Sequence, residues 1–276
     1  MKKLISMMIV FVMSFMSISA FAAYEAPVKL ASVYNYGDNV YTIHYYGTNG
    51  GVIFLGGNVD IHKLPDSMYR VGGHIWRFCF YNDKIYFLAG EAESDDTLAY
   101  IYSCNVDGSG IRLLADNASN KSEVYIVDNV LYYDAYATED SMNTYYYGYC
   151  GGIYSINLGD LSWKKIVSDN SKLAYCDGDY VYCGGQRAIS VDGKRVIKVR
   201  RDCDEYSWDV FVKGNQAYYA GEGDVYVRDK NGENVRFIQK IQYARLLIDS
   251  VTDDKVYIVV VFGGYPPSAY VYEINR

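Results

Sequence analysis

The stretch GNQAYYAGEGDVYVRDKNGENVRFIQK, residues 214–240, contains three runs of apolar and aromatic residues separated by polar turns that contain glycine. Short runs rich in Val and Tyr and bounded by Gly, Asn and Asp favour β-strands joined by tight turns. The stretch therefore predicts three consecutive antiparallel strands, a β-meander. A weaker form of the same pattern occurs five more times in the chain, which makes the meander a repeated unit.

Each repeat is marked by a short polar turn that is followed by an apolar residue and a tyrosine. Successive marker tyrosines are 36 to 50 residues apart, and they are Tyr41, Tyr86, Tyr132, Tyr182, Tyr218 and Tyr257. Repeats of this length are typical of four-stranded propeller blades. Because helical periodicity is nearly absent elsewhere, we predict an all-β fold, a six-bladed β-propeller of four-stranded antiparallel blades.

The strands within a blade are named A to D in chain order. A strands are predicted at 77–81, 124–127, 173–176, 209–212 and 246–249, and D strands at 111–114, 163–167, 195–199 and 235–238. The last repeat stops after its third strand, 271–275, whereas residues 27–31 form a spare strand. We expect this N-terminal strand to complete the last blade and close the ring, because closure removes exposed sheet edges. Two separate three-blade domains would explain neither end of the chain.

The first 22 residues have a basic start, an apolar run and an A-x-A-like site at Ala20–Ala22. This layout predicts a cleaved signal peptide at 1–22, with a retained membrane anchor as the alternative. Residues 23–276 then form a single β-propeller domain. We expect that domain to be secreted, periplasmic or on the cell surface, and not inserted in a membrane.

Composition excludes several classes of function. The chain carries 33 acidic against 26 basic side chains, which argues against nucleic-acid binding, and its three histidines all lie before residue 75. No G-x-S-x-G, H-E-x-x-H or phosphate-binding glycine loop is present. We therefore expect no cofactor, no metal and no catalytic residue of these types.

The six cysteines show no C-x-x-C spacing. Cys176 and Cys183 flank the turn DGDY and are the first pair to test for a disulfide in an exported chain. The alternative is that the cysteines are free, because a buried thiol in an apolar strand behaves as a small hydrophobic residue.

The third strands and the turns after them read IYSCNVDGSG at 101–110 and IYSINLGDLS at 153–162. This pattern resembles the YWTD-type propeller of low-density lipoprotein receptors, and more closely the exported bacterial propellers of unknown function that are similar to the receptor-related protein. The resemblance covers 27–276 and implies the propeller fold. The second strands read YTIH, YFLA, YYDA, YCGG, YYAG and YIVV, without the final Asp of YWTD, so we do not expect the receptor family's polar contacts between blades.

The A-to-B and C-to-D turns are uniformly short, whereas the B-to-C connections vary and reach 134–152 in the third repeat. Variable loops on a rigid scaffold are where binding residues are usually found. Exposed aromatic rings suit a sugar or a protein partner. The candidate ligand-binding residues on this face are Tyr45, Tyr46, Glu139, Asp140, Tyr145, Tyr146, Tyr147, Tyr149 and Tyr265.

The sequence thus predicts an exported, non-catalytic binding module for a protein or carbohydrate at the cell envelope. Three alternatives stay open. The tyrosines can pack only on one another. Carboxylates in the central depression of the same face can make the protein a hydrolase or lyase. A purely structural role in an envelope assembly would show as a large exposed apolar patch.

Overall fold

A computed structural model describes residues 27–31, 33–36, 39–46, 49–54, 74–90, 98–136, 150–168, 171–183, 187–198, 209–221, 223–241, 244–262 and 268–275. Every regular element in these ranges is a β-strand, which confirms the all-β prediction. None of the described residues forms a helix with the length and apolarity needed to cross a membrane. The predicted signal peptide lies outside the described residues.

After β1 (Val28–Lys29), the described strands form consecutive antiparallel meanders. The first meander is β2 (Val33–Tyr36), β3 (Asn39–Tyr46) and β4 (Asn49–Phe54). The second is β5 (His74–Tyr81), β6 (Lys84–Gly90), β7 (Leu98–Asn105) and β8 (Arg112–Ser119). The third is β9 (Val124–Val127), β10 (Val130–Tyr136), β11 (Cys150–Asn157) and β12 (Trp163–Val167). The second and third meanders belong to one sheet, because Ala135 of β10 pairs with Ala118 of β8.

The remaining meanders repeat this order. The fourth is β13 (Leu173–Cys176), β14 (Tyr180–Cys183), β15 (Arg187–Ser190) and β16 (Val196–Lys198). The fifth is β17 (Asp209–Lys213), β18 (Gln216–Gly221), β19 (Asp224–Asp229) and β20 (Arg236–Lys240). The sixth is β21 (Ala244–Val251), β22 (Lys255–Phe262) and β23 (Ser268–Asn275). The predicted A strands at 124–127 and 173–176 coincide with β9 and β13.

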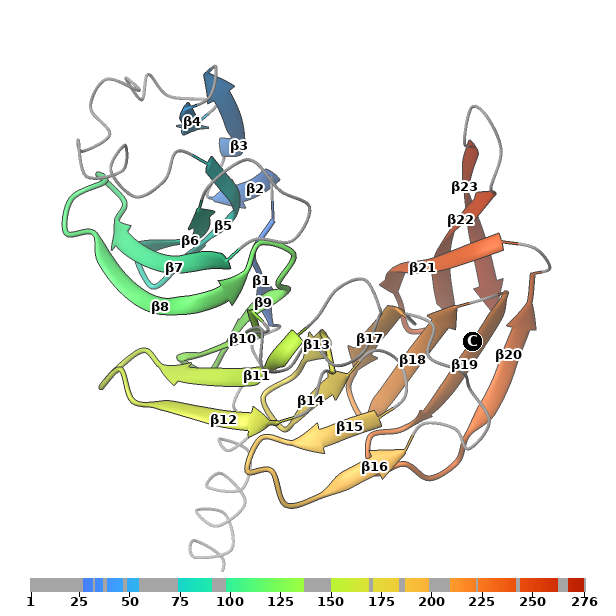
Figure 1. Cartoon of the computed structure of the whole chain (residues 1–276). Coiled ribbons are helices and arrows are strands. Elements are labelled where there is room, and N and C mark those ends of the chain that lie inside the picture. The colour runs from blue at the N-terminus through green and yellow to red at the C-terminus, as the bar shows by residue number, and fades with distance from the viewer. Residues whose placement is uncertain are drawn as a thin grey trace, which may run out of the picture.

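The meanders follow one another around an arc, from β2–β4 to β21–β23 (Figure 1). Their first strands lie innermost: β9 contacts β13, β13 contacts β17, and β17 contacts β21. Each first strand is joined to the second by a tight turn. At 82–83 and 128–129 both turn residues have positive φ, between 47° and 64°, as a two-residue hairpin requires. The first-to-second turns therefore lie at one end of the meanders and the second-to-third connections at the other end. Three of the latter have five or more residues, at 91–97, 137–149 and 263–267, whereas the other three have two or three residues.

The N-terminal strand does not lie where the sequence predicted. Instead of pairing with 271–275, β1 pairs with β9, with Val28 opposite Ile126 and Lys29 opposite Tyr125. Ala31 then bridges to Phe78 of β5, so the segment lies between the second and third meanders. The predicted completion of the last meander by residues 27–31 is wrong. When β1 pairs with β9, Leu30 is buried and Lys29 forms an ion pair with Glu123. Several side chains of β23 are exposed by comparison.

The core consists of the layers between neighbouring meanders. One cluster joins Leu30 to the second and third meanders, and others join the third to the fourth, the fourth to the fifth and the fifth to the sixth. Four marker tyrosines are buried in these layers: Tyr86, Tyr132, Tyr182 and Tyr218. The recurrence of tyrosine thus reflects its packing between sheets.

The four cysteines whose side chains are described, Cys79, Cys104, Cys176 and Cys183, are all buried and free. Cys176 is opposite Val181 and Cys183 is opposite Leu173, so the two thiols do not face each other across the hairpin. Burial raises the pKa of the Cys104 thiol to about 12. These side chains act as small hydrophobic residues in the core.

Candidate functional site

Most of the predicted site residues lie outside the described part of the chain: Glu139, Asp140, Tyr145, Tyr146, Tyr147, Tyr149 and Tyr265. Tyr45 and Tyr46 belong to β3, where their backbones pair with Gly50 and Asn49 beside the connection to β4. The side chains of these two tyrosines are not described. What the structure does describe near the same end of the meanders is a polar network that the sequence analysis did not predict.

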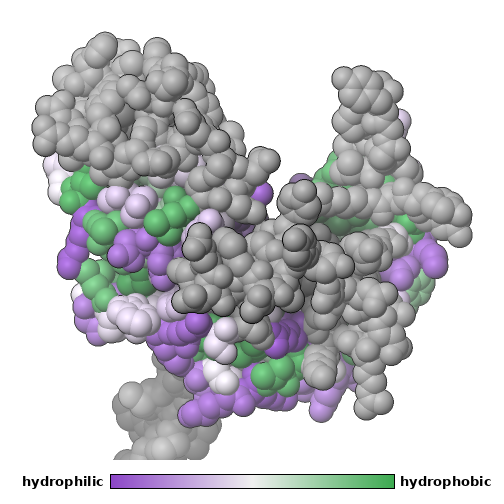
Figure 2. Space-filling view, viewed as in Figure 1, coloured by the Kyte–Doolittle hydropathy of each residue, from purple (hydrophilic) through white to green (hydrophobic). Residues whose placement is uncertain are grey.

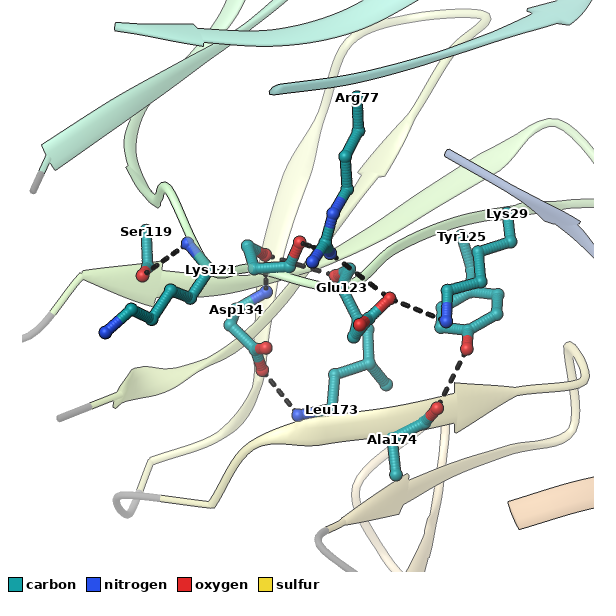
Figure 3. A network of polar contacts seen from close by, with 10 residues as sticks. Lys29, Arg77, Ser119, Lys121, Glu123, Tyr125, Asp134, Leu173 and Ala174 are labelled. Carbon is teal, nitrogen blue, oxygen red and sulfur yellow. Dashed lines mark hydrogen bonds and ion pairs between the residues drawn. The ribbon is translucent and has the colours of Figure 1, made fainter. Parts of the chain in front are cut away.

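This central polar network contains side chains from the N-terminal segment and from the second and third meanders (Figure 3). Its members lie at or near the starts of first strands and the end of a second strand. That end of the meanders carries the long connections, including 137–149 between β10 and β11. The members are Lys29, Arg77, Ser122, Glu123, Tyr125 and Asp134.

Two cations share one carboxylate at the centre of the network. Glu123 Oε2 lies 2.8 Å from Lys29 Nζ and 3.2 Å from Arg77 Nη1. All three side chains are partly exposed, so the Coulomb attraction is screened and its contribution to stability is modest. Arg77 Nη1 also donates a 2.6 Å hydrogen bond to Ser122 O. The network therefore holds the entry to β9 against β1 and β5.

Asp134 makes the most buried contact of the network. It is 4% exposed, and its Oδ1 accepts a 2.5 Å hydrogen bond from the backbone N–H of Leu173 in the next meander. Its own backbone N–H donates to Ser122 Oγ at 2.8 Å. A polar contact between neighbouring meanders is thus present, although no second strand has the final Asp of YWTD. The responsible Asp is the third residue of YYDA, one position before that of the YWTD motif.

Tyr125 links the same two meanders through its hydroxyl. Tyr125 Oη donates a 2.8 Å hydrogen bond to Ala174 O, and Lys29 Nζ lies 5.6 Å from the centre of its ring. Burial, together with the negative charges of Glu123 and Asp209, raises the pKa of Tyr125 well above 10.0. The phenol therefore stays neutral and acts as a donor at physiological pH.

Asp209, at the start of β17, makes an equivalent link between the fifth and sixth meanders. Its Oδ2 accepts a 2.7 Å hydrogen bond from the N–H of Ile248. Burial raises the pKa of the Asp209 carboxyl, although the hydrogen bond from Ile248 and the charge of Lys29 oppose that shift. An inward carboxylate that accepts a backbone N–H of the next meander therefore occurs twice on this face.

The three acidic residues Glu123, Asp134 and Asp209 make contacts that hold neighbouring segments together. Glu123 is held by two cations, and Asp134 and Asp209 each hold a neighbouring backbone. In the described ranges no three His, Cys, Asp or Glu side chains are grouped so that they could hold a metal ion. The signal that could have revealed the network is an Asp or Glu at the end of a strand that is otherwise apolar.

Replacing Asp134 with Ala is expected to lower the free energy of unfolding by about 1–3 kcal/mol, because the N–H of Leu173 would be buried without an acceptor. Chemical denaturation measures the change. Asp134→Asn is the matched control, since its amide oxygen can still accept this hydrogen bond. Equal stability of Asp134→Ala and wild type would show that the contact does not tie the two meanders together.

No family model matches the chain, and no curated protein matches it. Several solved structures are similar at low sequence identity. YCF48 from Cyanidioschyzon merolae aligns with a TM-score of 0.50 and 11% identity, over 88% of this chain and 81% of that chain. Oligopeptidase B from Leishmania major aligns with a TM-score of 0.54 and 10% identity, over 90% of this chain.

A puromycin hydrolase aligns with a TM-score of 0.51 and 10% identity, over 93% of this chain. The alignments span only 39% of the oligopeptidase B chain and 53% of the puromycin hydrolase chain. Identities this low support the fold alone. Consecutive antiparallel meanders with their first strands innermost, together with these similarities, show that the chain is an all-β protein with the β-propeller fold.

Proposed function

We propose that this chain is an exported, non-catalytic binding module that recognises a protein or carbohydrate at the cell envelope. Contact would be made by the face that carries the second-to-third connections. The observation that supports this face is the connection between β10 and β11, which is the longest connection between two strands of one meander. First-to-second turns such as 82–83 and 128–129 have two residues, whereas the connection 137–149 separates β10 from β11. Long loops on a rigid frame are suited to recognition.

The central polar network provides support directly beneath these loops. Asp134 lies in β10, two residues before the strand ends at Tyr136 and the long connection begins. Because Asp134 is tied to Leu173, the base of the loop is held against the next meander. A loop with a fixed base loses less conformational entropy on binding than a loop with a free base.

The contacts of three carboxylates on this face favour binding over the hydrolase alternative. A general acid or base must be within hydrogen-bond reach of the substrate. Glu123, Asp134 and Asp209 are instead occupied by cations or by backbone N–H groups. Figure 2 shows both hydrophilic and hydrophobic residues among the described atoms of the face that it draws.

We also infer that the meanders are the blades of a six-bladed propeller, of the type that the sequence resembles. The marker tyrosines support this inference because they occupy equivalent positions in the sheets. Tyr132 of β10 is opposite Ser155 of β11, and Tyr257 of β22 is opposite Glu273 of β23, each two residues before the third strand ends at Asn. A relationship to the YWTD-like exported propellers would explain this shared register.

The tyrosine cluster on the long connection provides the test of the proposed function. A glycan array and a pull-down from the native envelope would identify a ligand for the wild-type protein. Replacing Tyr145, Tyr146 and Tyr147 together with Ala is expected to weaken that binding by at least about tenfold, because aromatic anchors dominate interface energetics. The matched control is Trp163→Ala, an aromatic residue 70% exposed at the start of β12, beside the opposite, tight-turn end.

Thermal unfolding of both variants separates a loss of binding from a loss of folding. Wild-type affinity in a folded triple variant would remove the tyrosine cluster from the proposed site. Failure of the wild-type protein to retain any envelope protein or glycan would count against the proposed function itself.

A further inference from the structure

The sixth meander ends in β23, and no described strand pairs with its outer edge. Within the described residues β23 pairs with β22 alone, whereas the third strand of the third, fourth and fifth meanders is paired on both sides. Successive side chains of β23 are exposed: Tyr270 by 55%, Val271 by 66% and Tyr272 by 44%. Figure 1 shows this meander at the C-terminal end of the arc. An exposed strand edge of this kind is a template for pairing with another chain.

In the third meander the strand that corresponds to β23 is β11, and its outer edge is covered by β12. β11 ends in IYSIN and β23 ends in VYEIN. The two strands also have the same register, because Ser155 and Glu273 are each opposite the marker tyrosine of the preceding strand. Ile153, Tyr154 and Ser155 therefore correspond to Val271, Tyr272 and Glu273.

β12, of sequence WKKIV, covers β11 with a specific pattern of side chains. Val167 is opposite Ile153, Lys165 is opposite Tyr154, and Lys164 is opposite Ser155. The Nζ of Lys165 lies 5.3 Å from the centre of the Tyr154 ring, which is a cation–π contact. The fourth strands β16 and β20 also carry basic residues without acidic ones, namely Lys198, Arg236 and Lys240, whereas β8 carries Arg112 together with Asp116.

We propose that the open edge of β23 binds an extended segment of another protein, which adds as an antiparallel fourth strand. The segment would carry two adjacent basic residues flanked by apolar residues, as β12 does. One basic residue would lie over Tyr272 and the other would pair with Glu273. Main-chain hydrogen bonds would supply affinity, and the side chains would supply specificity.

Glu273 can accept this second cation. Its Oε2 already lies 2.6 Å from Lys255 Nζ, and the side chain remains 55% exposed. The central polar network contains the same arrangement, in which Glu123 is shared by Lys29 and Arg77. The site is separate from the long-loop face, so the inference does not depend on the proposed function.

A synthetic peptide with the sequence of residues 161–168, LSWKKIVS, is the probe. Labelled peptide is titrated with the full protein, and fluorescence anisotropy measures binding. We expect saturable binding that is weakened at least about tenfold when both lysines of the peptide are replaced with Glu. Glu273→Lys should reverse this preference, and Glu233→Lys, the same charge change on an exposed turn of the fifth meander, should not.

Hydrogen exchange of the free protein completes the test. We expect the outward-facing amides of β23 to exchange rapidly and to become protected when the peptide is added. Protection in the free monomer would mean that the chain covers its own edge, and a dimer that the peptide dissociates would mean that a second copy covers it. Either result, or binding that is indifferent to the charge at residue 273, overturns the proposal.

Discussion

Replacing Lys230 with Met is expected to lower the free energy of unfolding by about 3–5 kcal/mol, because a buried carboxylate would lose its cation. Asp177 is fully buried between the fourth and fifth meanders, and its Oδ2 lies 2.9 Å from Lys230 Nζ. It also accepts hydrogen bonds from the N–H groups of Asp179 and Tyr180 and from Tyr182 Oη. Of these partners, Lys230 carries the positive charge. Chemical denaturation at pH 7 measures the change.

Two controls isolate the charge. Asp179, which is 65% exposed and 2.7 Å from Lys230, contributes a solvent-screened pair, so Asp179→Asn is expected to cost less than about 1 kcal/mol. Combining Asp177→Asn with Lys230→Met should recover most of the loss, because the amide oxygen still accepts the backbone hydrogen bonds. A Lys230→Met variant within 1 kcal/mol of wild type would show that the hydrogen bonds alone satisfy Asp177.

The same pair predicts a dependence of stability on pH. Burial lowers the pKa of Lys230, but hydrogen bonds to Asp179 and Asp177 outweigh that effect and raise the pKa above its ordinary value of 10.5. A raised pKa in the folded state means that the stabilisation is fully present below pH 10.5 and is lost as the pH rises through the folded value. The difference between wild type and Lys230→Met should therefore stay constant near neutral pH and shrink under strongly alkaline conditions.

The strands could be predicted from the sequence because their signals are local. A two-residue polar turn followed by an apolar residue and a tyrosine specifies a hairpin within a few residues, and β9 and β13 begin and end where the pattern predicted. The packing of the marker tyrosines follows from the same periodicity, because alternate side chains of a strand face the same neighbouring sheet.

The contacts between meanders could not be predicted in this way. Lys230 and Asp177 are 53 positions apart, and Asp134 and Leu173 are 39 apart, so no short motif contains either pair. Comparison with YWTD concerns an Asp at the fourth position of the motif, whereas Asp134 is the third residue of YYDA. The candidate tyrosines at 145–147 lie outside the described residues, and their role stays a prediction.

The position of the N-terminal strand was mispredicted for a related reason. A short strand such as PVKLA can form backbone hydrogen bonds with any open sheet edge. The edge with which it pairs therefore depends on the contacts that its side chains make there. The sixth repeat lacks a fourth strand, and this favours β23 as the partner of the N-terminal strand. The number of strands does not show, however, where an apolar side chain of that strand can be buried. The structure places Leu30 in the core with Cys79, Val124 and Ile126.

Replacing Leu30 with Ala is accordingly expected to lower the free energy of unfolding by about 2–5 kcal/mol, since Leu30 is 1% exposed and its removal leaves a cavity between β5 and β9. Lys29→Ala, next to it, removes a half-exposed ion pair and should cost less than about 1 kcal/mol. Urea denaturation of both variants gives the comparison.

Val271→Ala distinguishes this position of the N-terminal segment from the one predicted by strand counting. With β1 on β9, Val271 is 66% exposed and its truncation should change stability by no more than about 0.5 kcal/mol. If residues 27–31 instead covered β23, Val271 would be buried by the added strand and its truncation would be costly, whereas Leu30→Ala would no longer open a cavity between β5 and β9. If Leu30→Ala left stability unchanged and Val271→Ala lowered it, residues 27–31 would have to lie on β23. The last meander would then have no open edge for a partner.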